Sequence, residues 1–156
     1  MLIELTKGQV AIIDDEDYQL IAKHRWHANE YRPKLFRAVA RTSRKEGHKS
    51  IYMHRLLLGV TDVNTHVDHI DGNPLNNRRN NLRICTNHQN RYNSKTPSTN
   101  TTGYKGVYLN KYNGRYYAYI SSNNIRTSLG GYSSPEDAYA AYCKAAHEMH
   151  GVFART

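Results

Sequence analysis

The sequence predicts an α+β fold in two small units, and three features of the chain carry that prediction. Short apolar runs with strand-like alternation recur in the first 60 residues and again after residue 103. Between them, residues 93–102 are polar apart from one proline and contain nothing that can be buried. A capped helical segment then closes the chain. We therefore expect an N-terminal domain over 1–92, a polar linker over 93–102 and a C-terminal domain over 103–156.

The N-terminal part is expected to mix strands with one helix. Leu2–Ile13 contains strand-like apolar runs, and four acidic residues, Asp14–Asp17, follow it. Acidic side chains favour the positive end of a helix, so the pattern predicts a helix over roughly Asp15–Arg25. Phe36–Arg41 and Ser50–Leu57 are predicted as two further strands.

The C-terminal part predicts a three-stranded antiparallel sheet packed on one helix. The expected strands are Tyr104–Leu109, Tyr116–Ser121 and Ile125–Leu129, separated by Asn-Gly and Asn-Asn turns. Ser134 is the expected N-cap of the helix, Pro135 its first residue and Gly151 its end. Alternation along the strands turns one set of side chains to the helix, namely Val107, Ala118, Ile120 and Leu129.

Composition and charge restrict the possible partners. The chain has 156 residues, with 22 Lys and Arg against 13 Asp and Glu, a formal charge of +9. Such an excess indicates nucleic acid as partner, the alternative being a basic protein with no acidic partner. No apolar run approaches the ~18 residues of a membrane span, and the N-terminus does not resemble a signal peptide, so we expect a cytoplasmic protein with no membrane partner. Cys85 and Cys143 are isolated, so no structural zinc is expected.

A polar stretch in the middle of the chain carries the chemistry. It contains Asp68-His69-Ile70-Asp71-Gly72-Asn73, then Asn76-Asn77-Arg78 and Asn81-Leu82-Arg83. Hydrolysis of a phosphodiester needs a base that activates water and a hard cation that stabilises the leaving oxygen. Adjacent Asp and His residues supply both, but they reach one site only where a strand ends, since neighbouring side chains point to opposite faces.

The residues after this turn are expected to complete the site. Asn81–Ile84 predicts a returning strand, and Thr86-x-x-Gln89 matches a capping box that starts a helix. Asn90 falls one turn into that helix. Strand, loop, strand and helix would thus bring together four polar side chains, those of Asp68, His69, Asn81 and Asn90.

These motifs resemble the HNH nuclease family, most of all the branch of phage-encoded homing and intron-associated endonucleases. The resemblance implies a ββα-metal core over about 62–94, with His69 as general base and Asp68 and Asn90 as ligands of one divalent cation, Mg²⁺ or Mn²⁺. It implies that Asn81 orients His69 through its amide or backbone. Met53-His54-Arg55-Leu56 also matches this branch, but the resemblance implies no role for His54. Five basic residues around the site are expected to contact DNA phosphates, the alternative being a solvated basic face: Arg78, Arg79, Arg83, Arg91 and Lys95.

The C-terminal part resembles the DNA-binding domain of the plant ethylene-response-factor and APETALA class. The motifs are Tyr104-Lys105-Gly106-Val107-Tyr108, Gly114–Ile120, Leu129-Gly130-Gly131-Tyr132 and Glu136-Asp137-Ala138. In that family the outer face of the sheet enters the major groove and is rich in Arg and Trp, whereas several of those places here hold Tyr, Ser or Asn. The residues expected to contact DNA are Lys105, Tyr108, Arg115, Tyr117, Tyr119 and Arg126. The alternative is a tyrosine-rich sheet that packs on the nuclease domain.

Taken together, the motifs predict a metal-dependent DNA endonuclease of homing type, guided by a C-terminal sequence-reading domain. A single metal site favours a nick by a monomer on double-stranded DNA, in the cytoplasm of a host cell if the protein is phage-encoded. The rival interpretation is a DNA-binding regulator with an inactive nuclease core. An RNA-binding protein that stacks bases on its tyrosines is a third interpretation, although no RNA-binding module is recognised.

Overall fold

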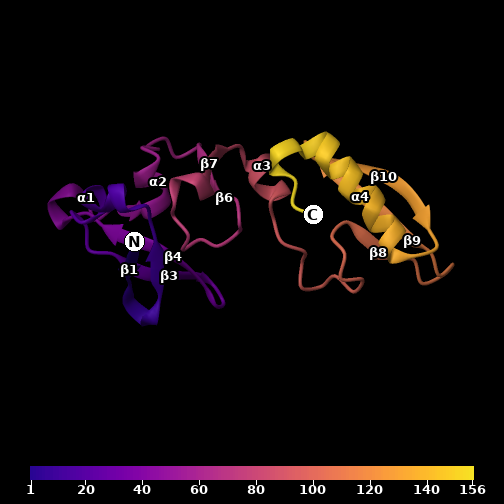
Figure 1. Cartoon of the computed structure of the whole chain (residues 1–156), viewed down its shortest axis with the longest axis horizontal. Coiled ribbons are helices and arrows are strands. Elements are labelled where there is room, and N and C mark those ends of the chain that lie inside the picture. Colours follow the sequence, from indigo (N-terminus) through magenta and orange to yellow (C-terminus); the bar gives the residue numbers. More distant parts are fainter. The chain divides into compact units, whose positions relative to one another are not determined.

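Short antiparallel sheets with small helices between them make up the first part of the chain. The computed structural model describes all residues, 1–156. They divide into two compact units, Met1–Thr86 and Asn87–Thr156, drawn in Figure 1. The division falls before the helix α3, whereas the sequence predicted a linker over 93–102.

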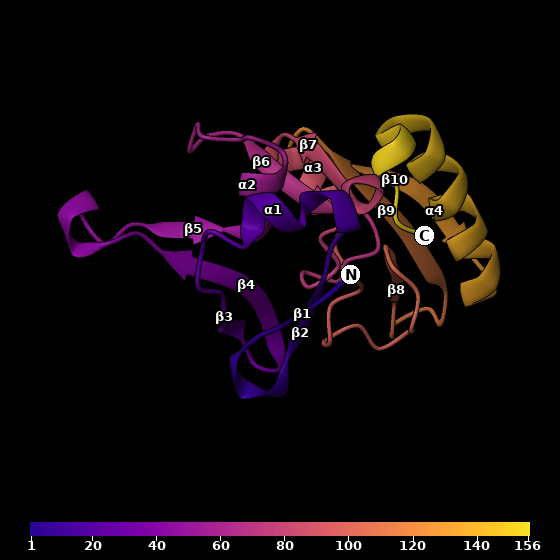
Figure 2. The ribbon, with the colours of Figure 1, turned by 60° about the vertical axis from the view of Figure 1, so that its left-hand side comes forward.

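Three sheets form the frame of the first unit. A hairpin pairs β1 with β2, a three-stranded sheet has the order β3-β4-β5, and β6 pairs with β7. In Figure 2, β4 lies between β3 and β5. The strands are β1 (Leu2–Glu4), β2 (Val10–Ile12), β3 (His27–Arg32), β4 (Leu35–Arg41), β5 (Ser50–Tyr52), β6 (His66–His69) and β7 (Leu82–Cys85). The helices are η1 (Thr6–Gly8), η2 (Asp15–Asp17), α1 (Tyr18–Ile21), η3 (Arg44–Glu46), α2 (Met53–Leu57) and η4 (Arg79–Asn81).

Two predicted elements of this unit are wrong in part. The helix expected over Asp15–Arg25 ends at Ile21, where the indole of Trp26 donates a hydrogen bond of 2.8 Å to the Ile21 carbonyl. The strand expected over Ser50–Leu57 becomes helical at Met53. Met53 and Leu57 lie four residues apart, on one helix face, and both are buried in the core.

One strand had no signal in the sequence. β3 contains only one buried residue, Ala28, and its other side chains are polar or aromatic and partly or fully exposed. Its pairing with β4 gives it its conformation. β4 itself was predicted over Phe36–Arg41 and is confirmed within one residue at its start.

The second unit is a three-stranded antiparallel sheet of order β10-β9-β8 with one long helix on one face, and Figure 1 shows α4 lying along it. The elements are α3 (Asn87–Tyr92), β8 (Val107–Leu109), β9 (Tyr116–Ser122), β10 (Ile125–Tyr132), α4 (Pro135–His150) and η5 (Gly151–Phe153). The predicted helix is confirmed together with its cap, because Ser134 Oγ accepts a hydrogen bond of 3.1 Å from the Asp137 amide. None of the helices combines the length and apolarity that crossing a membrane would require.

The core of the second unit matches the alternation of the strands. Val107, Ala118 and Ile120 are fully buried, and Leu129 packs against them. Small and aromatic residues of α4 cover them, chiefly Ala138, Tyr142 and Ala146. The predicted inward face of the sheet is therefore confirmed.

The segment predicted as a linker is bound into the second unit at both ends. Near its start, Lys105 Nζ donates hydrogen bonds to the carbonyls of Tyr92 at 2.6 Å and Ser94 at 2.7 Å. Near its end, the Asn100 amide donates to the carbonyl of Tyr104 and accepts from the backbone of Gly103. Apart from one proline, this segment has no apolar side chains to bury, and side-chain hydrogen bonds hold it against the rest of the unit.

Gly106 generates a stability prediction. Its φ is +75°, and an added Cβ would overlap the ring of Tyr142 and lie 2.8 Å from the Tyr119 carbonyl oxygen. Gly106→Ala should therefore cost about 3 kcal/mol or more of unfolding free energy, from backbone strain and overpacking together. Urea unfolding measures this loss.

Gly114 is the matched control, because its φ is +68° and nothing lies within 4 Å of an added Cβ. Gly114→Ala should cost only the backbone term, about 1 kcal/mol. Equal losses in the two variants would contradict the packing of Gly106 against Tyr142.

Candidate functional site

The site begins at the C-terminal end of β6, where Asp68 and His69 lie next to each other. β7 pairs with this strand, so that Arg83 lies opposite Asp68 and Leu82 opposite His69. Asp68 is 6% exposed and His69 9% exposed. The predicted return strand over Asn81–Ile84 is confirmed as β7, and it provides the support for the end of β6.

Arg83 holds the carboxylate of Asp68. Its Nε and Nη2 donate to Asp68 Oδ2 at 2.9 and 2.7 Å. Both side chains are largely buried, so solvent screens this ion pair less than a surface pair. Arg83 was predicted to contact DNA phosphate, but in this structure its guanidinium instead orients Asp68.

A buried asparagine holds the ring of His69. Asn77 is fully buried, and its Oδ1 lies 3.3 Å from His69 Nε2. Its Nδ2 donates to the Leu75 carbonyl at 3.1 Å, so Oδ1 is the atom that faces the ring. An amide oxygen can only accept, so the proton of the neutral imidazole lies on Nε2 and its lone pair on Nδ1.

Asn77 was missed as a site residue. It stands in Asn76-Asn77-Arg78, a motif recognised in the sequence without a role for its members. Its complete burial comes from the fold, since its backbone amide donates to the carbonyl of Ile12 on β2 at 2.7 Å. A contact with a strand 65 residues earlier leaves no local signal in the sequence.

Burial keeps the two neighbouring histidines neutral. The rings of His54 and His69 make an edge contact with centroids 5.2 Å apart, and Tyr52 stacks on His54. Burial lowers the pKa of His54 to about 3, and electrostatic interactions with His69 and Arg55 lower it further. Burial also lowers the pKa of His69, against the opposing effect of its hydrogen bond with Asn77. Near neutral pH, His69 is therefore an unprotonated imidazole that is able to accept a proton.

Asn81 organises the loop that follows His69. Its Oδ1 accepts from the Asp71 amide at 3.0 Å, and its Nδ2 donates to Asp71 Oδ1 at 3.0 Å and the Asn76 carbonyl at 2.8 Å. Its own carbonyl accepts from the Ile70 amide at 2.9 Å. Asn81 thus fixes the backbone next to His69, while Asn77 contacts the ring.

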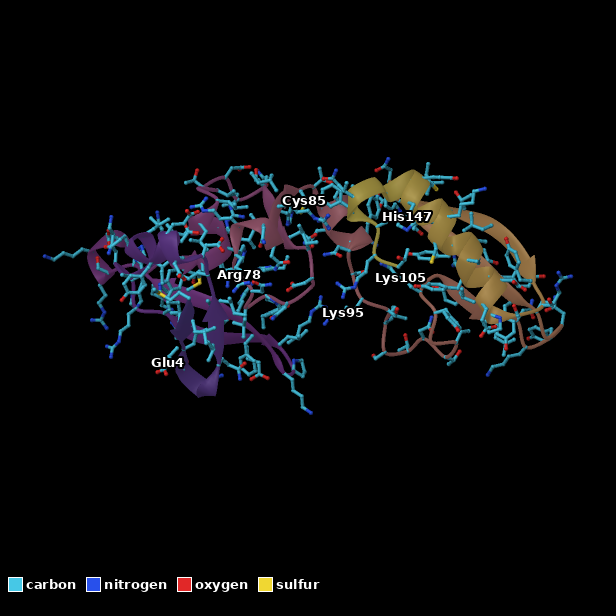
Figure 3. All side chains as sticks on the ribbon, in the orientation of Figure 1. Glu4, Arg78, Cys85, Lys95, Lys105 and His147 are labelled. Carbon is cyan, nitrogen blue, oxygen red and sulfur yellow. The ribbon has the colours of Figure 1, made fainter.

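The two other predicted phosphate contacts of the first unit, Arg78 and Arg79, differ in their surroundings. Arg79 binds the buried carboxylate of Asp17 through Nε at 3.0 Å and Nη2 at 2.6 Å, and its backbone amide donates to Asp14. It therefore ties the loop to the N-terminal segment. Arg78, labelled in Figure 3, is exposed and forms no ion pair. Of these two predicted phosphate contacts, only Arg78 has its charge available to a ligand.

The donors expected to hold the cation belong to different units. Asp68 ends β6 in the first unit, and Asn90 lies on α3 in the second. Nowhere in the chain do three His, Cys, Asp or Glu side chains come together as a metal-ligand group. A carboxylate and an amide oxygen are nevertheless the hard donors that Mg²⁺ and Mn²⁺ accept, with water and phosphate in the remaining positions. The donor set therefore fits such an ion, and the shared role of Asp68 and Asn90 stays a prediction.

The outer face of the second unit carries an aromatic–arginine cluster. The guanidinium of Arg126 lies 4.0 Å from the ring centroid of Tyr119 and 5.1 Å from that of Tyr108. Tyr108 is 52% exposed. Tyr117 pairs with Tyr108 across the sheet, and its ring lies against Gly131.

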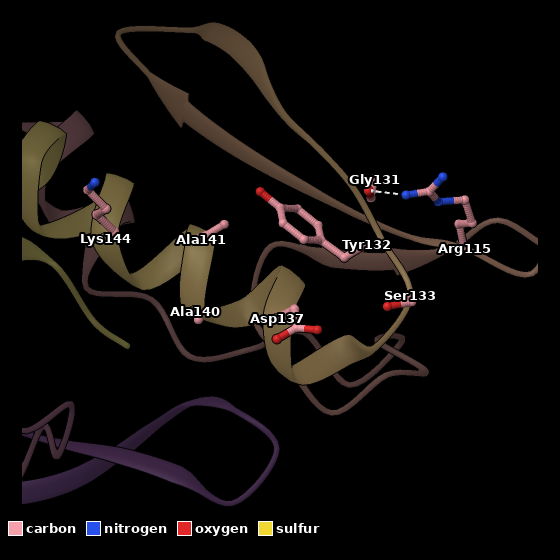
Figure 4. A pocket seen from close by; sticks show the side chains of 8 residues that line it. All are labelled: Arg115, Gly131, Tyr132, Ser133, Asp137, Ala140, Ala141 and Lys144. Atoms are coloured by element: carbon pink, nitrogen blue, oxygen red, sulfur yellow. Dashed lines mark hydrogen bonds between the residues drawn. The ribbon is translucent and has the colours of Figure 1, made fainter.

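Two other predicted DNA contacts of this unit are engaged within the protein. Lys105 is partly buried, and its role as a DNA contact stays a prediction. Its ammonium group contacts three carbonyls, and burial lowers its pKa to about 8. Arg115 donates to the Gly131 carbonyl at 2.7 Å, at the rim of a cavity of about 590 Å³ between α4 and the end of β10, drawn in Figure 4.

Comparison with known proteins gives the family. Residues 52–92 match the HNH endonuclease family. The chain is 34% identical over 90 residues to Protein 3.8 of Escherichia phage T7, which covers 58% of this chain and 74% of that protein. It is 28% identical over 148 residues to an uncharacterised HNH endonuclease of Acanthamoeba polyphaga mimivirus, covering 95% of this chain and 74% of the relative.

The chain belongs to the HNH endonuclease family. It is a nuclease, and the predicted family of the central motifs is confirmed. No solved structure matches it. The family match ends at residue 92, so the resemblance of the C-terminal part to the ethylene-response-factor and APETALA class stays a prediction.

The burial of His54 predicts that the nuclease is sensitive to acid. A histidine whose folded pKa lies below its unfolded value of about 6.5 contributes its full stability above that value. The contribution is lost as the pH falls from about 6.5 towards the folded pKa of about 3. The free energy of unfolding should fall by up to about 1.4 kcal/mol for each pH unit in this window.

The comparison of the parent with His54→Gln isolates this effect, since all other groups titrate in both proteins. Urea unfolding between pH 7 and pH 4 should give a shallower loss for the variant. Parallel curves would mean that His54 is not kept neutral by the fold.

Proposed function

We propose that this nuclease hydrolyses a phosphodiester bond of double-stranded DNA with the help of a divalent cation, cutting one strand. The observation that carries the proposal is the state of His69. The ring is neutral, its tautomer is set by Asn77, and it lies beside the oriented carboxylate of Asp68. A candidate base and a candidate oxygen ligand therefore lie together at the end of one strand, as metal-assisted hydrolysis of a phosphodiester requires.

His69 acts as the general base in this proposal. Its Nδ1 takes a proton from the attacking water, and the contact between Nε2 and Asn77 keeps the ring in that orientation. After proton transfer, the imidazolium still donates to Asn77 through Nε2. Asn81 and Arg83 are positioning residues, because the first fixes the backbone after His69 and the second fixes the carboxylate of Asp68.

Asp68 and Asn90 would hold the cation, Mg²⁺ or Mn²⁺. When bound, the cation stabilises negative charge on the phosphate and on the leaving oxygen. Two protein ligands with one negative charge between them give weak binding in the absence of DNA, so DNA phosphate completes the site. A single set of ligands favours a nick by a monomer.

The C-terminal unit serves as the reader in this proposal, in the manner of a homing-type endonuclease. The exposed Tyr108, the Arg126 guanidinium on Tyr119, and Tyr117 give its outer face both charge and apolar area. Such a face can contact base edges and thymine methyl groups in the major groove. Because both relatives are viral, we place this activity in the cytoplasm of an infected host.

The role of His69 predicts that His69→Ala abolishes cleavage while DNA affinity changes little. Loss of a general base typically lowers the rate by ~10²–10⁴. Nicking of supercoiled plasmid measures the rate, and it should require added Mg²⁺ or Mn²⁺. Gel-shift titration in a metal chelator measures affinity separately.

His66→Ala is the matched control, since His66 begins the same strand, β6, and has no part in the proposed reaction. It should cut within a few-fold of the parent. A His69→Ala variant that also cuts within a few-fold of the parent would remove His69 from this role.

The reader role predicts that Arg126→Ala loses site preference more than overall binding. A good arginine contact with a base is worth about 1–3 kcal/mol of discrimination. Cleavage mapping on a long duplex should therefore show preferred sites weakened about tenfold or more relative to the others. Lys111→Ala removes an exposed charge of the same unit and should leave the pattern unchanged. An unchanged pattern for Arg126→Ala would mean that another part of the chain reads the sequence.

A further inference from the structure

A basic groove in the second unit carries two cations, Arg91 and Lys95, that have no role in the proposed function. It has a volume of about 510 Å³ and lies between α3 with the segment after it, the edge of the sheet at β8, and the end of α4. Its walls include His88, Arg91, Lys95, Tyr108, Tyr119 and Asn123. This volume lies within the ~300–1,000 Å³ of sites that take a small molecule or a single residue of a polymer.

The charged side chains that line the groove are all basic. No Asp or Glu lines it. Arg91 and Lys95, the latter labelled in Figure 3, are exposed and form no ion pair. Two free cations on one wall, without an acid to neutralise them, favour an anionic ligand.

The groove is built rigidly. The ring of Tyr92 stacks on that of His150 with centroids 3.8 Å apart and planes 5° apart. The Tyr92 hydroxyl accepts from the backbone amide of Asn123 at 3.0 Å, and Lys105 Nζ donates to the carbonyls of Tyr92 and Ser94. These contacts join the end of α3 to α4 and to the β9–β10 turn, so the walls are already in place before a ligand binds.

Aromatic rings line the same groove as these cations. Tyr108 and Tyr119 belong both to this groove and to the outer face of the sheet, so a chain can pass from one to the other. A positively charged groove that also contains aromatic rings is the pattern by which proteins bind single-stranded nucleic acid with little regard to sequence. A duplex is too wide to enter a cavity of about 510 Å³, whereas one nucleotide of a single strand is not.

We propose that this groove binds a single-stranded segment of DNA, with flanking phosphates on Arg91 and Lys95 and a base against Tyr108. The proposal rests on the proposed function in that a DNA-nicking enzyme produces a strand end that can leave the duplex. The groove would hold that end after cleavage, which is a role distinct from reading the duplex on the outer face.

The test measures binding of a fluorescein-labelled single strand of about 12 nucleotides, within the site sizes of such proteins. Fluorescence anisotropy is recorded with the full chain in a metal chelator, so that no cleavage takes place. Arg91→Ala combined with Lys95→Ala is compared with Lys111→Ala combined with Lys144→Ala. Both double variants lose two exposed charges of the same unit, but only the first pair lies in the groove.

The groove variant should bind the single strand at least about tenfold more weakly, and the control less than about threefold. For the groove variant, the slope of the logarithm of the binding constant against the logarithm of the salt concentration should be smaller in magnitude by about 1.4. Each phosphate contact on a single strand contributes about 0.7, and the variant loses two. Tyr108→Leu should weaken the single strand several-fold at an unchanged slope, because it removes stacking and no charge. Circular dichroism checks that all variants are folded.

Equal weakening by the two double variants would overturn the proposal, because binding would then follow net charge alone. Retained affinity in the groove variant would overturn it as well. The measurement involves no cleavage, so its failure is separate from failure of the nuclease function, which the plasmid assay reports.

Discussion

One buried side chain, Asn77, connects the candidate base with the frame of the first unit. Its backbone amide binds the Ile12 carbonyl on β2, its Nδ2 binds the Leu75 carbonyl, and its Oδ1 faces His69. A fully buried amide that lost any of these partners would carry the free-energy cost of an unsatisfied polar group, about 1–3 kcal/mol. The geometry of His69 is therefore coupled to the stability of the unit.

Hydrogen bonds of polar side chains also hold the rest of the central polar stretch, which contains little apolar surface. Asn81 binds Asp71 and the Asn76 carbonyl, and Asn73 Oδ1 accepts from the Leu75 amide. Arg79 joins the stretch to Asp17. A network of hydrogen bonds in which every member is satisfied is rigid and specifies one arrangement. This rigidity explains why a region poor in hydrophobic residues can position catalytic groups.

The sequence predicted most accurately the elements whose signals are local. The cap at Ser134, the alternation of Val107, Ala118 and Ile120, and the Asp68-His69 strand end each depend on residues close together in the chain. The errors concern residues whose conformation or burial depends on contacts with distant parts of the chain. β3 is a strand because β4 pairs with it, and Met53 starts a helix because the core takes up one face of α2. Asn77 escaped notice because its decisive partner is on β2.

The charge of the protein shows the same division between local pattern and long-range contact. The sequence alone does not distinguish one cation from another. Its 22 basic residues outnumber its 13 acidic ones, which suggests a broadly positive surface. Several of the basic residues are bound within the protein, among them Arg79 on Asp17, Arg83 on Asp68 and Lys105 on backbone carbonyls. These three stabilise loops, and their charge is neutralised or enclosed. Other cations are exposed and form no ion pair, among them Arg78, Arg91, Lys95 and Arg126. Because each phosphate contact adds to the salt dependence separately, the salt dependence of DNA binding counts the cations that reach phosphate and does not follow from the net charge of +9.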